Sequence, residues 1–108
     1  MRIRQVTDLD YGMVAIPTPG HTAGHCCLLL DDRFLFTGDH LDWDRRHGRL
    51  DASEDYCWDS WPKQLDSIRR LRDYRFEWVL PGHGQRVQLP AEQMQNELNC
   101  LVSRLGTV

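Results

Sequence analysis

Three short apolar runs in this sequence each end at a glycine-containing turn that carries a histidine or an aspartate. The turns are residues 18–25 (TPGHTAGH), 36–40 (FTGDH) and 80–84 (LPGHG). Glycine allows the backbone to turn sharply and to approach another group closely. Because the ends of strands in one sheet converge at one edge, this pattern predicts a sheet with polar, ligand-type side chains gathered along that edge.

The apolar pattern predicts four strands. They are expected at residues 12–17, 26–30, 34–37 and 76–80, and the second and third form a hairpin around residues 31–33, which begin with two aspartates. These runs are unbroken rather than alternating. We therefore expect both faces of the sheet to be covered.

Two helices are expected in the second half of the chain. Ser60 is a suitable N-cap for the first helix, and the second lies over residues 94–105, between Pro90 and Gly106. Residues 38–57 show no period and are expected to form a long loop. The result is an α+β fold in which helices pack on a sheet. The stripe of the first helix has apolar residues three or four apart: Trp58, Trp61, Leu65, Ile68 and Leu71.

Composition excludes several classes of protein. A net charge of -3 with no basic block argues against a nucleic-acid partner and against an anionic membrane. No apolar stretch approaches the roughly 20 residues of a membrane span, and the first residues have no signal-peptide core, so a cytoplasmic location is expected. The four cysteines contain no CxxC pair and do not suggest a disulfide framework.

The residue types in the three turns suit a metal site. Imidazole nitrogen and carboxylate oxygen are good ligands for zinc, iron or manganese. Taken one at a time, a histidine in a turn is more often a solvated side chain or a local hydrogen-bond partner. On the residues alone, both interpretations stay open.

The three motifs together, in this order, resemble the second half of the metallo-β-lactamase superfamily. The resemblance extends from about Val14 to Arg104, and residues 58–84 are most similar to a subgroup often accompanied by a ferredoxin-like segment. It implies that residues 1–108 form a single partial domain. That domain is half of an αββα sandwich, a mixed sheet with helices packed on one face.

The resemblance also implies roles for individual residues. His21 corresponds to a ligand of the first metal, and Asp39 to the catalytic carboxylate that bridges two metals. His83 corresponds to a ligand of the second metal. His25 matches a histidine that is usually structural, and His40, next to the bridging position, is a second-shell candidate. The implied cofactor is zinc, with iron or manganese as alternatives.

The family's HxHxDH signature, which supplies four further ligands, does not occur in the 108 residues. The resemblance therefore implies the C-terminal fragment of a metal-dependent hydrolase. In the complete family, a metal-bound hydroxide attacks a small-molecule ester, thioester, lactam or phosphoester. Two protein ligands per metal are fewer than the three usual in catalytic zinc sites. We therefore expect weak metal binding and little hydrolysis by the chain alone.

Two partners are expected for such a half-domain, and the sequence does not choose between them. One is a missing N-terminal half, and the other is a second copy of the chain. The alternative function is a non-catalytic metal-binding or interaction module, including a homodimer. Half of a two-sheet domain leaves an apolar sheet face uncovered, and such a face favours association.

Overall fold

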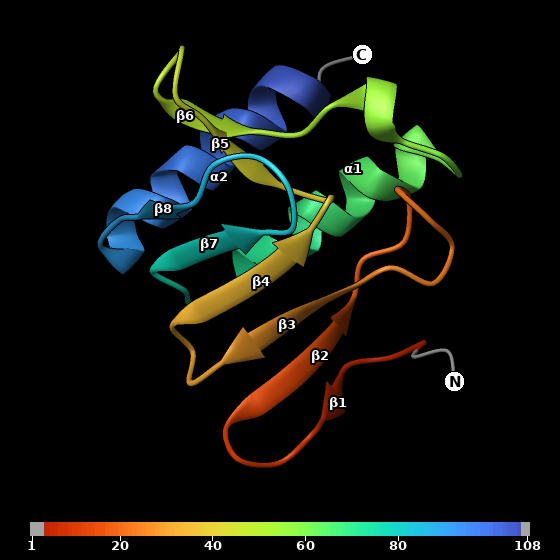
Figure 1. Cartoon of the computed structure of the whole chain (residues 1–108), viewed down its shortest axis with the longest axis vertical. Helices are drawn as coiled ribbons and strands as arrows, with labels where there is room; N and C mark the ends of the chain where they lie inside the picture. The colour runs from red at the N-terminus through yellow and green to blue at the C-terminus, as the bar shows by residue number, and fades with distance from the viewer. Residues whose placement is uncertain (1–3, 107–108) are drawn as a thin grey trace.

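The computed structural model describes residues 4–106, which form one six-stranded sheet with two α-helices (Figure 1). The order across the sheet is β1-β2-β3-β4-β7-β8. The strands are β1 (Thr7–Asp8), β2 (Met13–Pro17), β3 (Cys26–Leu30), β4 (Phe34–Gly38), β7 (Trp78–Pro81) and β8 (Val87–Gln88).

Strand direction determines which turns meet. β2 pairs antiparallel with β3, and β3 pairs antiparallel with β4, so β2 and β4 run in the same direction. β4 then pairs parallel with β7. The carboxyl ends of β2, β4 and β7 therefore lie at one edge of the sheet, as the turn motifs predicted.

Both helices lie on the same face of the sheet, behind it in Figure 1. α1 (Trp61–Arg70) begins after Ser60, whose hydroxyl accepts a hydrogen bond from the Lys63 amide, a cap worth about 1 kcal/mol. Pro62 fits the first turn because that turn needs no amide donor. α1 continues into the short 3₁₀ helix η2 (Leu71–Asp73), and the last helix is α2 (Ala91–Gly106).

The core lies between this sheet face and the two helices. Side chains alternate across each strand, so Ile16, Cys27, Leu29, Leu35 and Val79 point to the helical side and are almost fully buried. They form one cluster with helix residues Ile68, Leu71, Met94, Leu98 and Leu101. The α+β class, with helices on one face of a mixed sheet, is thus confirmed.

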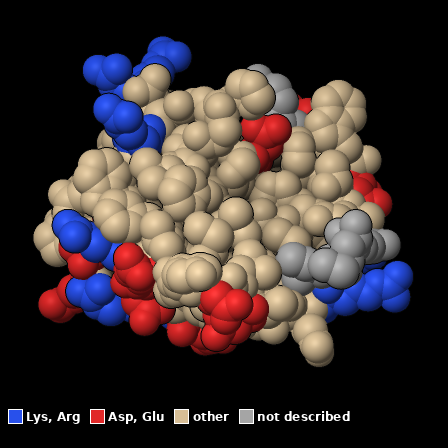
Figure 2. Space-filling model, turned by 60° about the horizontal axis from the view of Figure 1, so that its bottom comes forward, with Lys and Arg blue, Asp and Glu red and all other residues tan. Residues whose placement is uncertain are grey.

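The opposite face of the sheet is apolar but open within residues 4–106. Phe36 pairs with Leu28 on one side and with Leu80 on the other, and its exposed fraction is 40%. Figure 2, which turns the lower edge of Figure 1 forward, shows charged side chains mainly at the margins of this view. The expectation that both faces are covered is not met by the described part of the chain. We call this surface the open sheet face, formed by Met13, Leu28, Leu30, Phe34, Phe36, Trp78 and Leu80.

The region expected to be a long loop is partly ordered, and that prediction was wrong. Strands β5 (Asp42–Asp44) and β6 (Arg49–Asp51) form a separate hairpin, followed by the 3₁₀ helix η1 (Glu54–Tyr56). The hairpin turn is stabilised by Asp44, whose carboxylate accepts hydrogen bonds from the backbone amides of Arg46 and His47. Strands of three residues are too short to show a period.

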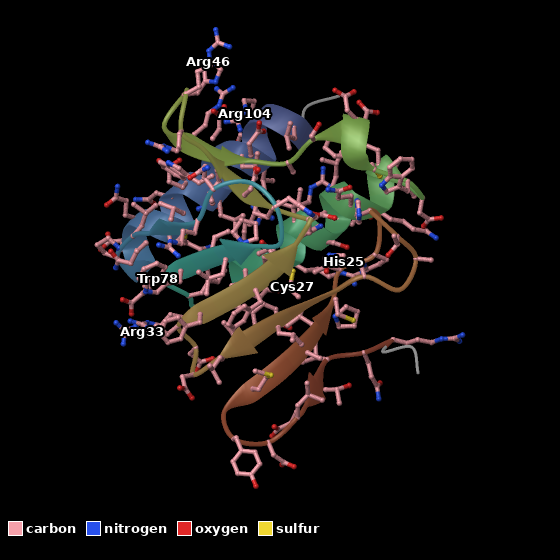
Figure 3. All side chains as sticks on the ribbon, in the orientation of Figure 1. His25, Cys27, Arg33, Arg46, Trp78 and Arg104 are labelled. Atoms are coloured by element: carbon pink, nitrogen blue, oxygen red, sulfur yellow. The ribbon has the colours of Figure 1, made fainter. Side chains whose placement is uncertain are left out.

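The hairpin is held in place at both of its strands. The Trp43 amide donates to the carbonyl of Gln85, and Arg104 of α2 donates to the carbonyl of Leu50 at 2.8 Å. In Figure 3 Arg104 lies beside the hairpin, toward the end of α2, whereas Arg46 at the hairpin tip points away from the body of the protein. No helix formed by residues 4–106 is long and apolar enough to cross a membrane.

Candidate metal centre

The three turns bring His21, Asp39 and His83 together at the shared edge of the sheet. His83 Nδ1 lies 2.8 Å from Asp39 Oδ1, and His21 Nε2 lies 3.5 Å from Asp39 Oδ2. The two imidazoles thus approach different oxygens of one carboxylate. His21 is 18 positions and His83 is 44 positions from Asp39 in the sequence, so only the fold makes them neighbours.

The turn that carries His21 is fixed against α1. Gly20 has φ +141°, and a Cβ there would collide with the backbone of Gln64. The Ser67 hydroxyl donates to the Pro19 carbonyl at 2.7 Å. Glycine is therefore required for close packing, and it holds His21 in a mostly buried position with 9% of its surface exposed.

Asp39 is held as a carboxylate. The hydrogen bond from His83 is the main cause that lowers its pKa below the usual value, and the nearby His21 and His25 add to it. Desolvation opposes this only partly, because the side chain is 39% exposed. An ionised carboxylate with two accessible oxygens is the form that binds metal ions.

His25 occupies a supporting position beside the turn. Its Nδ1 lies 2.8 Å from the Thr18 hydroxyl, and its ring centroid is 5.8 Å from that of His21. Burial lowers the pKa of His25, and the neighbouring His21 lowers it further. Figure 3 shows it between the start of β3 and the end of β4.

His40 is fully buried, although it follows the half-exposed Asp39 directly. Burial lowers its pKa to about 3, so the ring is neutral. Neither ring nitrogen has a hydrogen-bond partner. Its backbone carbonyl accepts a hydrogen bond from the side chain of Gln64, which ties the turn after β4 to α1. The ring centroid lies 5.6 Å from that of His25.

His21, Asp39 and His83 carry donor atoms of the types that bind metal ions. In this structure, however, they are arranged as a hydrogen-bonded cluster. Two imidazoles and a carboxylate are suitable ligands for zinc. Across residues 4–106, no group of three or more His, Cys, Asp or Glu side chains is placed to hold a metal ion. In this structure His83 is hydrogen-bonded to Asp39 itself, through its Nδ1.

A cavity of about 740 Å³ opens over this cluster. His21, Asp39 and His83 contribute to its lining, and the β5–β6 hairpin and Trp58 supply further walls. Such a volume is in the range of small-molecule sites. The cavity extends the cluster into a candidate binding site.

Trp58 and Trp43 line this cavity, and sequence reasoning missed both. Trp58 was assigned to the stripe of the first helix, but α1 begins three residues later and leaves Trp58 78% exposed. Its backbone amide donates to the carbonyl of His21. The Ser60 cap was the available signal, because a residue before an N-cap lies outside the helix.

The sequence profile of the metallo-beta-lactamase superfamily matches residues 5–83, well over half of the chain. The chain therefore belongs to the metallo-β-lactamase superfamily, in agreement with the three motifs and with the fold.

Individual relatives are longer than this chain. An atrochrysone carboxyl ACP thioesterase from Aspergillus fumigatus is 28% identical over 88 residues, which are 79% of this chain and 24% of that protein. A metallo-beta-lactamase superfamily protein from Sulfolobus tokodaii is 26% identical, with a TM-score of 0.57, over 89% of this chain and 36% of that chain. The chain thus spans about a quarter of the curated relative and about a third of the archaeal structure.

A third comparison supports the fold alone. The DIM-1 metallo-beta-lactamase has a TM-score of 0.56 at 18% identity, over 94% of this chain and 46% of that chain. Nearly all of this chain therefore superposes on less than half of a structure of that fold.

Proposed function

We propose that this chain supplies part of the metal centre and the substrate cavity of a metal-dependent hydrolase. The observation that carries the proposal is the position of Asp39, with His21 at one of its oxygens and His83 at the other. A carboxylate with an imidazole at each oxygen gathers the donor types of a metal centre in one place, with His83 hydrogen-bonded to Asp39 in this structure. Superfamily membership and the cavity above the cluster support the same interpretation.

In this proposal, His21 and Asp39 would hold one metal, and Asp39 and His83 would hold the other. Metal ions in such sites generate a nucleophile from water at neutral pH and stabilise developing negative charge. His25 and His40 act as supports of the turns rather than as ligands. The contact of His25 with Thr18 and the burial of His40 favour that division of roles.

Further ligands must come from polypeptide outside these 108 residues or from a second copy of the chain. Two protein ligands per metal are fewer than the three that catalytic zinc sites usually have. We therefore expect weak metal binding and little hydrolysis by the chain alone.

Esters and thioesters are the preferred substrate class in this proposal, with lactams and phosphoesters as alternatives. The support is the thioesterase from Aspergillus fumigatus, whose similarity covers 79% of this chain. The fold by itself hosts several chemistries and does not choose among them.

The decisive experiment is the metal content of the purified chain, measured by elemental mass spectrometry after dialysis against zinc, iron or manganese. We expect metal in the wild-type chain and loss of it in His21→Ala and Asp39→Ala. His47→Ala is the matched control, because His47 pairs with Asp44 on the exposed hairpin turn. Metal that survives in both cluster variants, or no metal at any concentration tested, would overturn the assignment of these ligands to this chain.

A second candidate function is a non-catalytic binding module that acts through the open sheet face. The exposed Phe36 in the middle of an apolar row favours it. The same preparations distinguish the two candidates. An associated chain that never takes up metal supports the module, and metal loss in the cluster variants supports the hydrolase.

A further inference from the structure

The two tryptophans of the cavity are each connected to one of the two histidine-bearing turns. The Trp58 amide donates to the His21 carbonyl at 2.9 Å. The Trp43 amide donates to the carbonyl of Gln85, two residues after His83, at 3.0 Å. The backbone of each tryptophan is therefore bonded to a turn that carries one of the two histidines beside Asp39.

The exposure of Trp58 is unusual for its residue type. An indole is a large apolar group that normally gains free energy from burial, yet 78% of the surface of Trp58 is exposed. It lies in a segment with hydrogen bonds on both sides, since the Cys57 thiol and the Ser60 amide donate to the Gly20 carbonyl. A large aromatic side chain held at the wall of a cavity is a prepared contact surface for a ligand.

The charge of the cavity further limits the class of ligand that it can bind. Its lining contains four aspartates, Asp39, Asp42, Asp44 and Asp51, against one arginine, Arg45. Asp42 is partly desolvated and faces the negative charges of Asp51 and Asp44, which together raise its pKa. In the metal-free chain, a field of this sign disfavours an anionic ligand. Arg45 is exposed on the hairpin turn, and Arg104 lies 3.5 Å from Asp51, so these two arginines offset only part of the negative charge of the four aspartates.

We propose that the cavity binds uncharged aromatic esters or thioesters, with the aromatic group in contact with Trp58 and Trp43. The inference depends on the proposed hydrolase function for the nature of the reacting bond. The aromatic preference and the exclusion of anions follow from the cavity alone. Trp58 and Trp43 are then specificity-determining residues, and the histidines and Asp39 are not.

The test is the binding of 2-acetonaphthone, an uncharged aromatic ketone without a leaving group, to the metal-free chain. The readout is the chemical shift of the indole Nε1–H signals in two-dimensional NMR. Cyclohexyl methyl ketone is the matched aliphatic probe. We expect the Trp58 and Trp43 signals to move with the aromatic probe, and the Trp78 signal to stay in place because Trp78 stacks on Phe34 outside the cavity.

Variants make the assignment quantitative. Trp58→Ala should weaken binding of the aromatic ketone about three- to tenfold, the range expected for loss of one aromatic contact. Trp58→Phe should retain most of the affinity, and Trp78→Phe should bind like the wild type. An unchanged affinity in Trp58→Ala, or equal affinity for the aliphatic ketone, would overturn the proposal.

A second binding experiment tests whether the charge of the cavity excludes anions. The anion 2-naphthoate should bind more weakly than the ketone, and Asp51→Asn should reduce the difference. Tighter binding of the carboxylate would show that Arg45 dominates and would overturn the uncharged class. Hydrolysis is measured separately, with the thioester S-(2-naphthyl) thioacetate as substrate and with zinc added to the chain. Binding without hydrolysis counts against the proposed function alone, and hydrolysis without aromatic preference counts against this inference alone.

Discussion

The imidazole of His83 is hydrogen-bonded to Asp39 across a sequence separation of 44 residues, with Nδ1 2.8 Å from Oδ1. The pair joins the turn after β7 to the turn after β4, and these are neighbouring parallel strands. It lowers the pKa of Asp39 and keeps the carboxylate ionised. The contact that joins the two turns is therefore also the one that keeps Asp39 negatively charged.

This pair should contribute little to folding. His83 is 90% exposed and Asp39 is 39% exposed, and exposed ion pairs are worth at most about 1 kcal/mol. We expect His83→Ala to change the free energy of unfolding in urea by less than about 1 kcal/mol. A loss of several kcal/mol would show that the turn after β7 is a folding element rather than a binding element.

Gly20 should be intolerant of any side chain. Its φ is +141°, and the new Cβ of Gly20→Ala would overlap the backbone of Gln64 in α1, so we expect a loss of about 3 kcal/mol. Gly48→Ala is the matched control, because φ is +63° there but no atom lies within 4 Å of the Cβ position. It should cost about 1 kcal/mol, from the left-handed backbone alone. Equal losses in urea unfolding would refute the role of the Gly20–α1 contact.

The cysteines should differ sharply in reactivity. Burial raises the pKa of Cys27 to about 12, so at pH 8 its thiol is protonated, and only the thiolate reacts with alkylating agents. Cys100 is exposed on α2 and should be labelled first by iodoacetamide. Peptide mass spectrometry against time gives the order, and labelling in urea gives the control in which all four cysteines react. Labelling of Cys27 as fast as Cys100 in the folded chain would contradict the buried position of β3.

The open sheet face should drive association of the chain. We expect sedimentation velocity to show a concentration-dependent increase in mass, because an apolar sheet face gains free energy when it is covered. Phe36→Lys should shift the distribution toward the monomer. Tyr11→Lys is the control, since Tyr11 is 98% exposed but lies in the turn between β1 and β2. A wild-type chain that stays monomeric at all concentrations would refute this prediction.

Much of the scaffold was predictable because local signals and the fold agree. The strands around Cys27, Leu35 and Val79, the Ser60 cap and the helix that follows it are all formed where the pattern indicated them. The meeting of His21, Asp39 and His83 followed from strand order, because like-directed strands end at one edge. Their ligand roles remain a prediction that the metal measurements above will test.

The remaining features depend on tertiary contacts that leave no periodic signal. The β5–β6 hairpin is held by single bonds to Gln85 and Arg104, which no local pattern of residues 42–51 encodes. The unbroken apolar runs indicated a sheet covered on both faces, but the described chain covers only one. Trp58 fits the helical spacing by coincidence, and the cap three residues before Lys63 decides against it.

The β5–β6 hairpin shapes the cavity without contributing a residue to the cluster of His21, Asp39 and His83. The ligand-type residues stand at the ends of β2, β4 and β7, where the sheet fixes their backbone. The hairpin forms part of the cavity wall and lies in the chain between β4 and α1. Substitutions at the tip of the hairpin can therefore alter which molecules enter without moving Asp39. The shape of the cavity and the His21–Asp39–His83 cluster can therefore be altered independently, by substitutions in different segments of the chain.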